Sequence, residues 1–155
     1  MYSYKKSVKI SIAVCIILFI ILGVLVFCAP FLFELYLTAY RGFAPEGEAL
    51  AMIKKVFMFC FYPSGVFSAV ILTALLSLLN NIKSGEIFTG KNVRYLRTVS
   101  LCCFAIAVIT LVGGFFYMPF LFVTFAGAFV GLMLRVLKNV MQTASEMREE
   151  NDLTI

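Results

Sequence analysis

Three stretches without a single charged side chain determine what this chain can fold into. They are Ile10–Phe33, Val56–Ile82 and Thr98–Leu134, of 24, 27 and 37 residues. A helix that crosses a membrane needs about 20 apolar residues, so the first two stretches each cross once and the third crosses twice. The sequence therefore predicts an all-α, integral membrane four-helix bundle, formed as a single domain over residues 1–155.

The turn that divides the third stretch is expected near Gly113 and Gly114. Pro119 follows shortly after, and proline suits the first turn of a helix because an N–H at that position has no partner within the helix. With this turn, the predicted helices cover about 9–34, 49–82, 93–115 and 119–147, followed by a short C-terminal tail.

The composition agrees with a membrane protein. Hydrophobic residues make up 63% of the chain and charged residues 14%, whereas apolar residues form about 45–50% of an ordinary globular domain. The first stretch follows Lys5, Lys6 and Lys9, as a secretory signal would, but the apolar part of a signal is only about 7–15 residues long. This stretch continues to Phe33, so we expect it to be retained as a helix.

The basic residues predict which ends face the cytoplasm. Ten Lys and Arg residues precede the first charge-free stretch, lie between the second and third stretches, or follow the third. Three lie between the first and second charge-free stretches, namely Arg41, Lys54 and Lys55. Because basic residues are enriched in cytoplasmic segments, both termini and segment 83–97 are expected on the cytoplasmic side of a bacterial cell membrane.

Residues Gly85–Asn92 read GEIFTGKN, which matches the phosphate-binding loop G-x-x-x-x-G-K followed by Ser or Thr, except at the last position. That loop needs a strand before it, a helix after it and a hydroxyl that holds Mg²⁺. Here Asn92 replaces the hydroxyl, and the preceding VILTALLSLLNNIKS is not a strand of a soluble sheet. We therefore predict no nucleotide and no other cofactor. Gly85 instead ends the second helix, and Thr89 caps a helix that begins at Gly90.

Two further motifs concern packing. Pro63 cannot donate to the carbonyl of Phe59, so the second helix is expected to kink there. Gly127 and Gly131 form a G-x-x-x-G pair that permits close helix approach. The partner of this pair is either another helix of the chain or a second copy, which would make a homo-oligomer.

Side chains suited to catalysis are few. The chain has no His, and no Asp or Glu lies inside the three charge-free stretches. A general base and the usual zinc ligand sets are therefore missing, and we predict neither an enzyme nor a metal site. The five cysteines lie in apolar segments and are interpreted as free thiols, with acylation of Cys102 and Cys103 as the alternative.

Transport is the alternative function. Ion-coupled transporters usually keep Asp, Glu, Lys, Arg or His residues inside the membrane, and the charge-free stretches contain none of these. A pore or carrier made of several copies stays open. Its polar lining would be Thr73, Ser77, Asn80 and Thr110.

The predicted cytoplasmic surface combines segment 83–97 with tail 139–155. The segment is basic, the tail ends in acidic residues, and both start from the same membrane face, so we expect one partner-binding surface. The simpler interpretation is that the basic residues only bind the anionic lipid of the bilayer, without direct nucleic-acid binding. The candidate partner-binding residues are Lys83, Glu86, Lys91, Asn92, Arg94, Arg97, Glu149, Leu153 and Ile155.

Two stretches together carry a resemblance: NNIKSGEIFTGKNVRYLRTVS from Asn80, and EENDLTI at the end. They resemble the small bacterial membrane proteins grouped as domain-of-unknown-function family twenty-nine seventy-five, over essentially the whole chain. The resemblance implies a multi-pass protein, often encoded beside a small cytoplasmic helix-turn-helix DNA-binding protein. It implies no reaction, substrate or catalytic residue. We therefore expect a regulator or scaffold that binds such a cytoplasmic partner.

Overall fold

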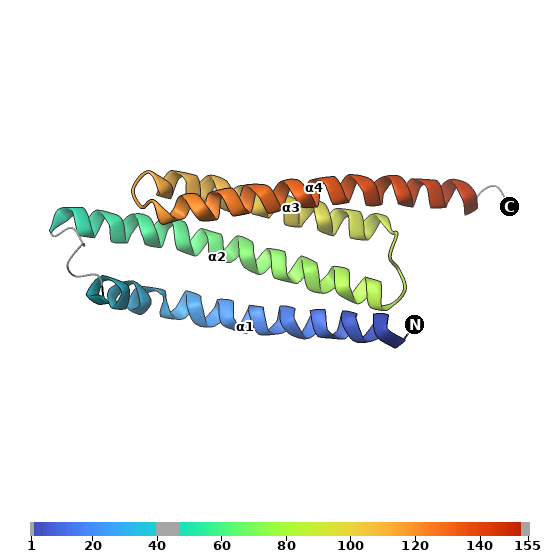
Figure 1. Ribbon diagram of the computed structural model, residues 1–155, viewed down its shortest axis with the longest axis horizontal. Coiled ribbons are helices and arrows are strands. Elements are labelled where there is room, and N and C mark those ends of the chain that lie inside the picture. The colour runs from blue at the N-terminus through green and yellow to red at the C-terminus, as the bar shows by residue number, and fades with distance from the viewer. Residues whose placement is uncertain (1, 40–46, 153–155) are drawn as a thin grey trace.

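The computed structural model describes residues 2–39 and 47–152, which form four helices (Figure 1). They are α1 (Tyr2–Ala39), α2 (Glu48–Lys83), α3 (Gly90–Gly114) and α4 (Pro119–Asp152). Each helix is long and apolar enough to cross a membrane. The prediction of an all-helical fold with four membrane-capable helices is therefore confirmed.

The outer helices are longer than their apolar stretches. Helix α1 already begins at Tyr2 rather than near residue 9, and α4 continues past residue 147 to Asp152. The apolar stretch marks where a helix can lie in the hydrocarbon, but Lys, Gln, Glu and Met are good helix formers in water as well. The end of α4 therefore extends as a helix well beyond the charge-free stretch that ends at Leu134.

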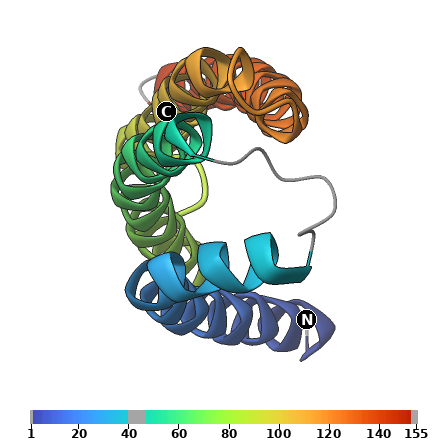
Figure 2. The same ribbon diagram turned by 90° about the vertical axis from the view of Figure 1, so that its left-hand side faces the viewer.

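Packing follows the order of the chain: α1 packs on α2, α2 on α3 and α3 on α4. Figure 1 shows the start of α1, the α2–α3 connection and the end of α4 at one end of the molecule, with the α3–α4 turn at the other. Seen along the helices, the chain forms an open arc, with α1 at one side and the α3–α4 pair at the other (Figure 2). Within the described residues α1 packs on neither α3 nor α4, so the predicted bundle is open rather than closed.

The tightest packing lies between α2, α3 and α4. Ala74, Val99 and Cys103 form a buried cluster there, and partly buried Tyr95 and Leu134 pack against it. Cys102 and Cys103 are both buried free thiols. The interpretation of these cysteines as packing residues therefore fits their surroundings better than acylation, which needs an accessible thiol.

The glycine pair of α4 packs against α3 of the same chain. A Cβ added at Gly127 would lie 3.3 Å from the carbonyl oxygen of Cys103, and one added at Gly131 would lie 3.3 Å from the Cβ of Cys103. The buried hydroxyl of Ser100 donates a 2.7 Å hydrogen bond to the carbonyl oxygen of Gly131. Glycine allows both backbones to come this close. Of the two partners left open for this glycine pair, the one in contact with it is therefore α3 of the same chain.

The turn between α3 and α4 follows the predicted chemistry. Phe116 and Tyr117 donate backbone hydrogen bonds of 3.0 and 2.9 Å to the carbonyl oxygen of Gly113, which closes the turn. Helix α4 then begins at Pro119, as predicted. Earlier in the chain, α2 stays helical through Pro63, and the kink expected there remains a prediction.

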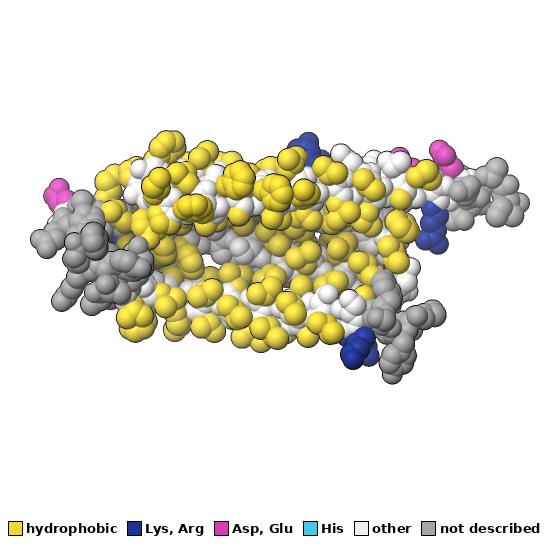
Figure 3. Space-filling model, viewed as in Figure 1, with side chains coloured by type: hydrophobic (Ala, Val, Ile, Leu, Met, Phe, Trp, Pro, Cys, Tyr) yellow, Lys and Arg dark blue, Asp and Glu magenta, His cyan; other side chains and the backbone are white. Residues whose placement is uncertain are grey.

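The outward faces of the helices are hydrophobic, as Figure 3 shows for one side of the molecule. Phe27, Phe59 and Phe125 are 87%, 75% and 76% exposed. A soluble protein rarely exposes so large a continuous apolar surface. Lipid chains cover such a surface at no cost, so this arrangement suits a helix assembly that lies in a bilayer.

Candidate functional site

The connection between α2 and α3 is held together by Asn92, whose side chain is 0% exposed. Its Nδ2 donates hydrogen bonds to the carbonyl oxygens of Glu86 and Ile87, at 2.6 and 2.8 Å. Its Oδ1 accepts a 2.8 Å hydrogen bond from Nδ2 of Asn81. One amide thus ties the end of α2, the connecting loop and the first turn of α3 into one unit.

This geometry gives the GEIFTGKN stretch a structural role that needs no bound phosphate. Helix α2, not a strand, leads into the loop. Gly85 has a φ of 87°, the left-handed conformation in which glycine ends a helix, as predicted. The position that would offer a Mg²⁺-binding hydroxyl is Asn92, and both ends of its amide are occupied within the loop.

Thr89 precedes the first residue of α3, as predicted, but its side chain makes no capping hydrogen bond. Its backbone carbonyl accepts hydrogen bonds from the N–H groups of Asn92 and Val93, at 3.0 and 3.3 Å. Its buried Oγ1 has no hydrogen-bond partner in the described part of the chain. The prediction that the Thr89 hydroxyl caps α3 is therefore wrong, because the Asn92 amide, not this hydroxyl, fixes the loop.

A polar cavity of ≈ 560 Å³ lies between this loop and the end of α4. The loop and the first turns of α3 supply one wall, and Ser145 and Arg148 of α4 supply the other. The segment and the tail that were expected to meet therefore do meet, over this part of their length. The residues on the loop side are Gly85, Glu86, Phe88, Thr89, Gly90, Lys91 and Arg94.

The cavity is mainly basic. Lys91, Arg94 and Arg148 line it together with one carboxylate, that of Glu86. Glu146 of the tail is not among the residues that line it. This carboxylate accepts a 3.0 Å hydrogen bond from Gln142 of its own helix.

Three predicted site residues lie elsewhere. Asn92 is fully buried, so its assignment to the partner-binding surface is wrong: its amide holds the loop. Lys83 is exposed at the end of α2 but does not line the cavity, and Arg97 lines a separate one with Arg135 and Lys138. The backbone of Glu149 lies in α4, whereas the Glu149 side chain, Leu153 and Ile155 lie outside the described part of the chain.

Ser145, Arg148 and Phe88 belong to the cavity wall but were missed in the sequence. Ser145 is 7% exposed, and Arg148 follows it by three residues, which places both on one side of α4. The helical pattern of the sequence continues into the tail, and this pattern alone would have placed Ser145 and Arg148 on one side of a helix.

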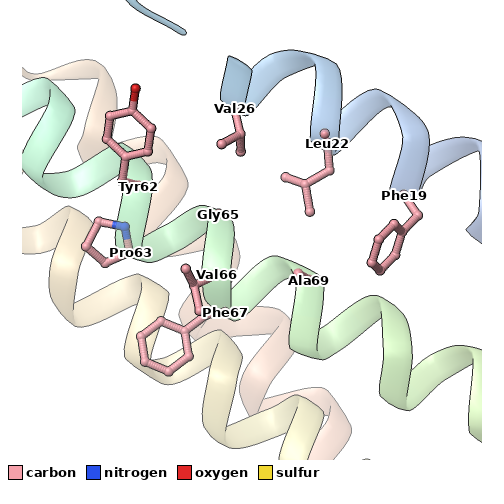
Figure 4. A pocket seen from close by; sticks show the side chains of 10 residues that line it. Phe19, Leu22, Val26, Tyr62, Pro63, Gly65, Val66, Phe67 and Ala69 are labelled. Atoms are coloured by element: carbon pink, nitrogen blue, oxygen red, sulfur yellow. The ribbon is translucent and has the colours of Figure 1, made fainter. Parts of the chain in front are cut away.

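A second cavity, of ≈ 670 Å³, lies between α1 and α2 (Figure 4). Phe19, Leu22 and Val26 of α1 face Tyr62 and Val66 of α2 across it. Its lining carries no Lys, Arg, Asp or Glu. It therefore offers mainly apolar contact, and Tyr62 brings a hydroxyl-bearing side chain to its lining.

The hydroxyls proposed to line a pore bond within the protein. Thr73 donates to its own helix at the carbonyl oxygens of Ala69 or Val70, and Ser77 donates to that of Thr73. Oγ1 of Thr110 lies 2.9 Å from Oγ1 of Thr124 and joins α3 to α4. These hydroxyls therefore have hydrogen-bond partners within the protein, as polar side chains in a lipid-facing helix require.

Comparison with protein-family models identifies the family of this chain. The family model described as "Protein of unknown function (DUF2975)" matches residues 38–155. The match begins at the end of α1, so it is narrower than the resemblance over essentially the whole chain that the sequence suggested. No curated protein and no solved structure matches the chain.

Proposed function

Because this chain belongs to the DUF2975 family, described as proteins of unknown function, we propose its role from its own residues. It is a multi-pass membrane protein that binds a cytoplasmic protein partner and acts as a regulator or scaffold. It is not an enzyme: the chain has no His, and no Asp or Glu lies in its charge-free stretches.

The protein lies in a bacterial cell membrane with both termini in the cytoplasm. Ten basic residues on the side of the termini against three on the other side support this orientation. The even number of helices brings the start of α1, the α2–α3 loop and the end of α4 to one end of the molecule, as Figure 1 lets the reader follow. In this orientation the loop–α4 cavity opens into the cytoplasm.

The observation that carries the proposal is the cavity between the α2–α3 loop and α4. Ser145 lies 11 residues beyond Leu134, the last residue of the charge-free stretch. At about 1.5 Å per residue, this places it roughly 16 Å beyond the edge of the hydrocarbon. The headgroup layer is only about 5–7 Å thick, so the α4 wall of the cavity is presented to the aqueous phase, where a soluble protein can reach it.

The chemistry of the cavity suits an acidic segment of a partner protein. Lys91 and Arg94 provide charge on the first turns of α3, next to a loop that Asn92 holds in place, and a preorganised surface loses less entropy on binding. The resemblance implies that the partner is a small helix-turn-helix protein, held at or released from the membrane. DNA would then be bound by the partner, not by this chain.

The test is capture of the full-length protein in mild detergent, followed by direct binding of the identified and purified partner. The Lys91→Gln, Arg94→Gln double variant is expected to weaken this binding about tenfold or more. The control is Lys6→Gln, Lys9→Gln, which removes the same charge from exposed positions at the start of α1. Equal loss in both variants would leave only non-specific charge attraction and would overturn the proposal.

The pore alternative has its own readout. Tracer flux through proteoliposomes that contain the purified protein is expected to equal that of empty liposomes. Flux that rises with protein density would favour the pore and contradict the regulator proposal.

A further inference from the structure

A second polar cavity, of ≈ 290 Å³, lies between α3 and α4, apart from the partner-binding cavity. Arg97, Ser100 and Leu101 of α3 line it together with Arg135 and Lys138 of α4. Ser100 is 4% exposed, and its hydroxyl donates to the carbonyl oxygen of Gly131, which joins the two helices at this level. Three cations therefore surround a cavity between two helices that are packed closely together.

This cavity lies at the edge of the hydrocarbon. Arg97 directly precedes the charge-free stretch Thr98–Leu134, and Arg135 directly follows it. Because α3 and α4 form a hairpin with a short turn, the two ends of this stretch return to the same level. Lys138 is three residues further, or about 5 Å along a helix, which is still within a headgroup layer of about 5–7 Å.

The three cations have no internal counter-charge. The chain contains no Asp or Glu from residue 87 to residue 145, and the acidic residue within α2 is Glu48, at the opposite end of that helix. Among the described side chains, no carboxylate lies within 4.0 Å of Arg97, Arg135 or Lys138. Cations held together without a partner repel one another, so an anion between them lowers their free energy.

The surface of α3 that continues from the cavity into the charge-free stretch fits an acyl chain. Leu101 follows Arg97 by one helical turn, and Val108 follows Leu101 by two turns on the same side of α3. Leu101 is 56% exposed and Val108 is 62% exposed. A molecule with an anionic head and an apolar chain would therefore contact the cations and this apolar strip together.

We propose that Arg97, Arg135 and Lys138 form a binding site for the phosphodiester of an anionic phospholipid headgroup, whose acyl chain lies along Leu101 and Val108. The guanidinium groups match the oxygens of a phosphate in pairs, and Lys138 adds a point charge. Basic pockets between membrane helices recognise such headgroups by the same chemistry. The site is separate from the proposed partner surface and does not depend on it.

The experiment measures lipid binding to the full-length protein in a neutral detergent, by native mass spectrometry and thermal shift. Three probes separate the sources of phosphate: phosphatidylglycerol, phosphatidylcholine with the same acyl chains, and inorganic phosphate. Phosphatidylglycerol is expected to bind at least tenfold more tightly than either of the others. Equal binding of phosphatidylcholine would overturn the proposal, and equal stabilisation by inorganic phosphate would assign the site to a soluble anion instead.

Two variants test the residues. Arg97→Gln, Arg135→Gln is expected to lose the preference for phosphatidylglycerol, by about fivefold for each cation removed. The matched control Lys91→Gln, Arg94→Gln removes the same charge from α3 at the other cavity and is expected to keep the preference. If the double variant is poorly folded without lipid, Lys138→Gln alone is used, and its preference for phosphatidylglycerol is expected to fall as well. A preference that survives in the well-folded variants would contradict the site.

Discussion

The side-chain amide of Asn81 donates a 2.8 Å hydrogen bond to the side-chain oxygen of Asn92, joining the end of α2 to the first turn of α3. Asn92 also donates to two carbonyl oxygens of the loop. Replacing Asn92 by Ala leaves these partly buried groups without their partners, and each buried group left unsatisfied costs up to about 1–3 kcal/mol. We expect Asn92→Ala to lower the thermal unfolding midpoint in detergent clearly. Asn139→Ala, at an exposed position of α4, is the control and should leave it unchanged.

The same loop gives a prediction about nucleotides. Asn92→Ser completes the phosphate-binding consensus, but helix α2 still leads into the loop where a strand is needed. Neither the natural protein nor Asn92→Ser should bind ATP or GTP at micromolar concentrations in equilibrium dialysis with Mg²⁺. Binding that Lys91→Ala removes would contradict this prediction.

The number of helices was predictable because it follows directly from the charge-free stretches of the sequence. The lengths of the stretches Ile10–Phe33, Val56–Ile82 and Thr98–Leu134 decide how often the chain can cross a membrane. The open arc was not predictable in this way. Lipid and protein are equally apolar, so the hydrophobic pattern does not reveal which helix faces which neighbour.

The candidate site was predicted in part for a similar reason. The proximity of the loop to α4 follows from the number of crossings, and Lys91 and Arg94 do line the cavity. The role of Asn92 depends on three hydrogen bonds with residues five to eleven positions away, which a consensus pattern does not contain. Arg135 and Lys138 were counted only as topology signals, since their position opposite Arg97 depends on how α3 and α4 pack.

Helix packing between α3 and α4 gives a stability prediction. Gly131→Val puts a branched side chain where even a Cβ would lie 3.3 Å from Cys103 and Phe104. Overpacking of this kind typically costs about 1–3 kcal/mol, and it also strains the hydrogen bond from Ser100. We expect a lower unfolding midpoint in detergent. Gly23→Val on α1, where a Cβ meets nothing within 4 Å, is the matched control; similar losses in both variants would refute the packing argument.

The orientation in the membrane is testable with reporter fusions. A reporter attached after Ile155 is expected to be active on the cytoplasmic side, and one attached after Gly42 on the opposite side. The reason is the excess of basic residues on the side of the termini, ten against three. The same side for both fusions would contradict the predicted topology.

The contribution of α4 to partner binding can be separated from that of the loop. Arg148 lines the partner cavity from the side opposite Lys91 and Arg94, so Arg148→Gln is expected to weaken binding of the purified partner about fivefold. A charge at the rim of an interface acts mainly on the association rate, and salt screens it. The loss should therefore appear in the association rate, and it should shrink as the salt concentration rises from 50 to about 500 mM. Lys138→Gln, at the other cavity of the same helix, is the control; an equal loss there would mean that α4 contributes only its net charge.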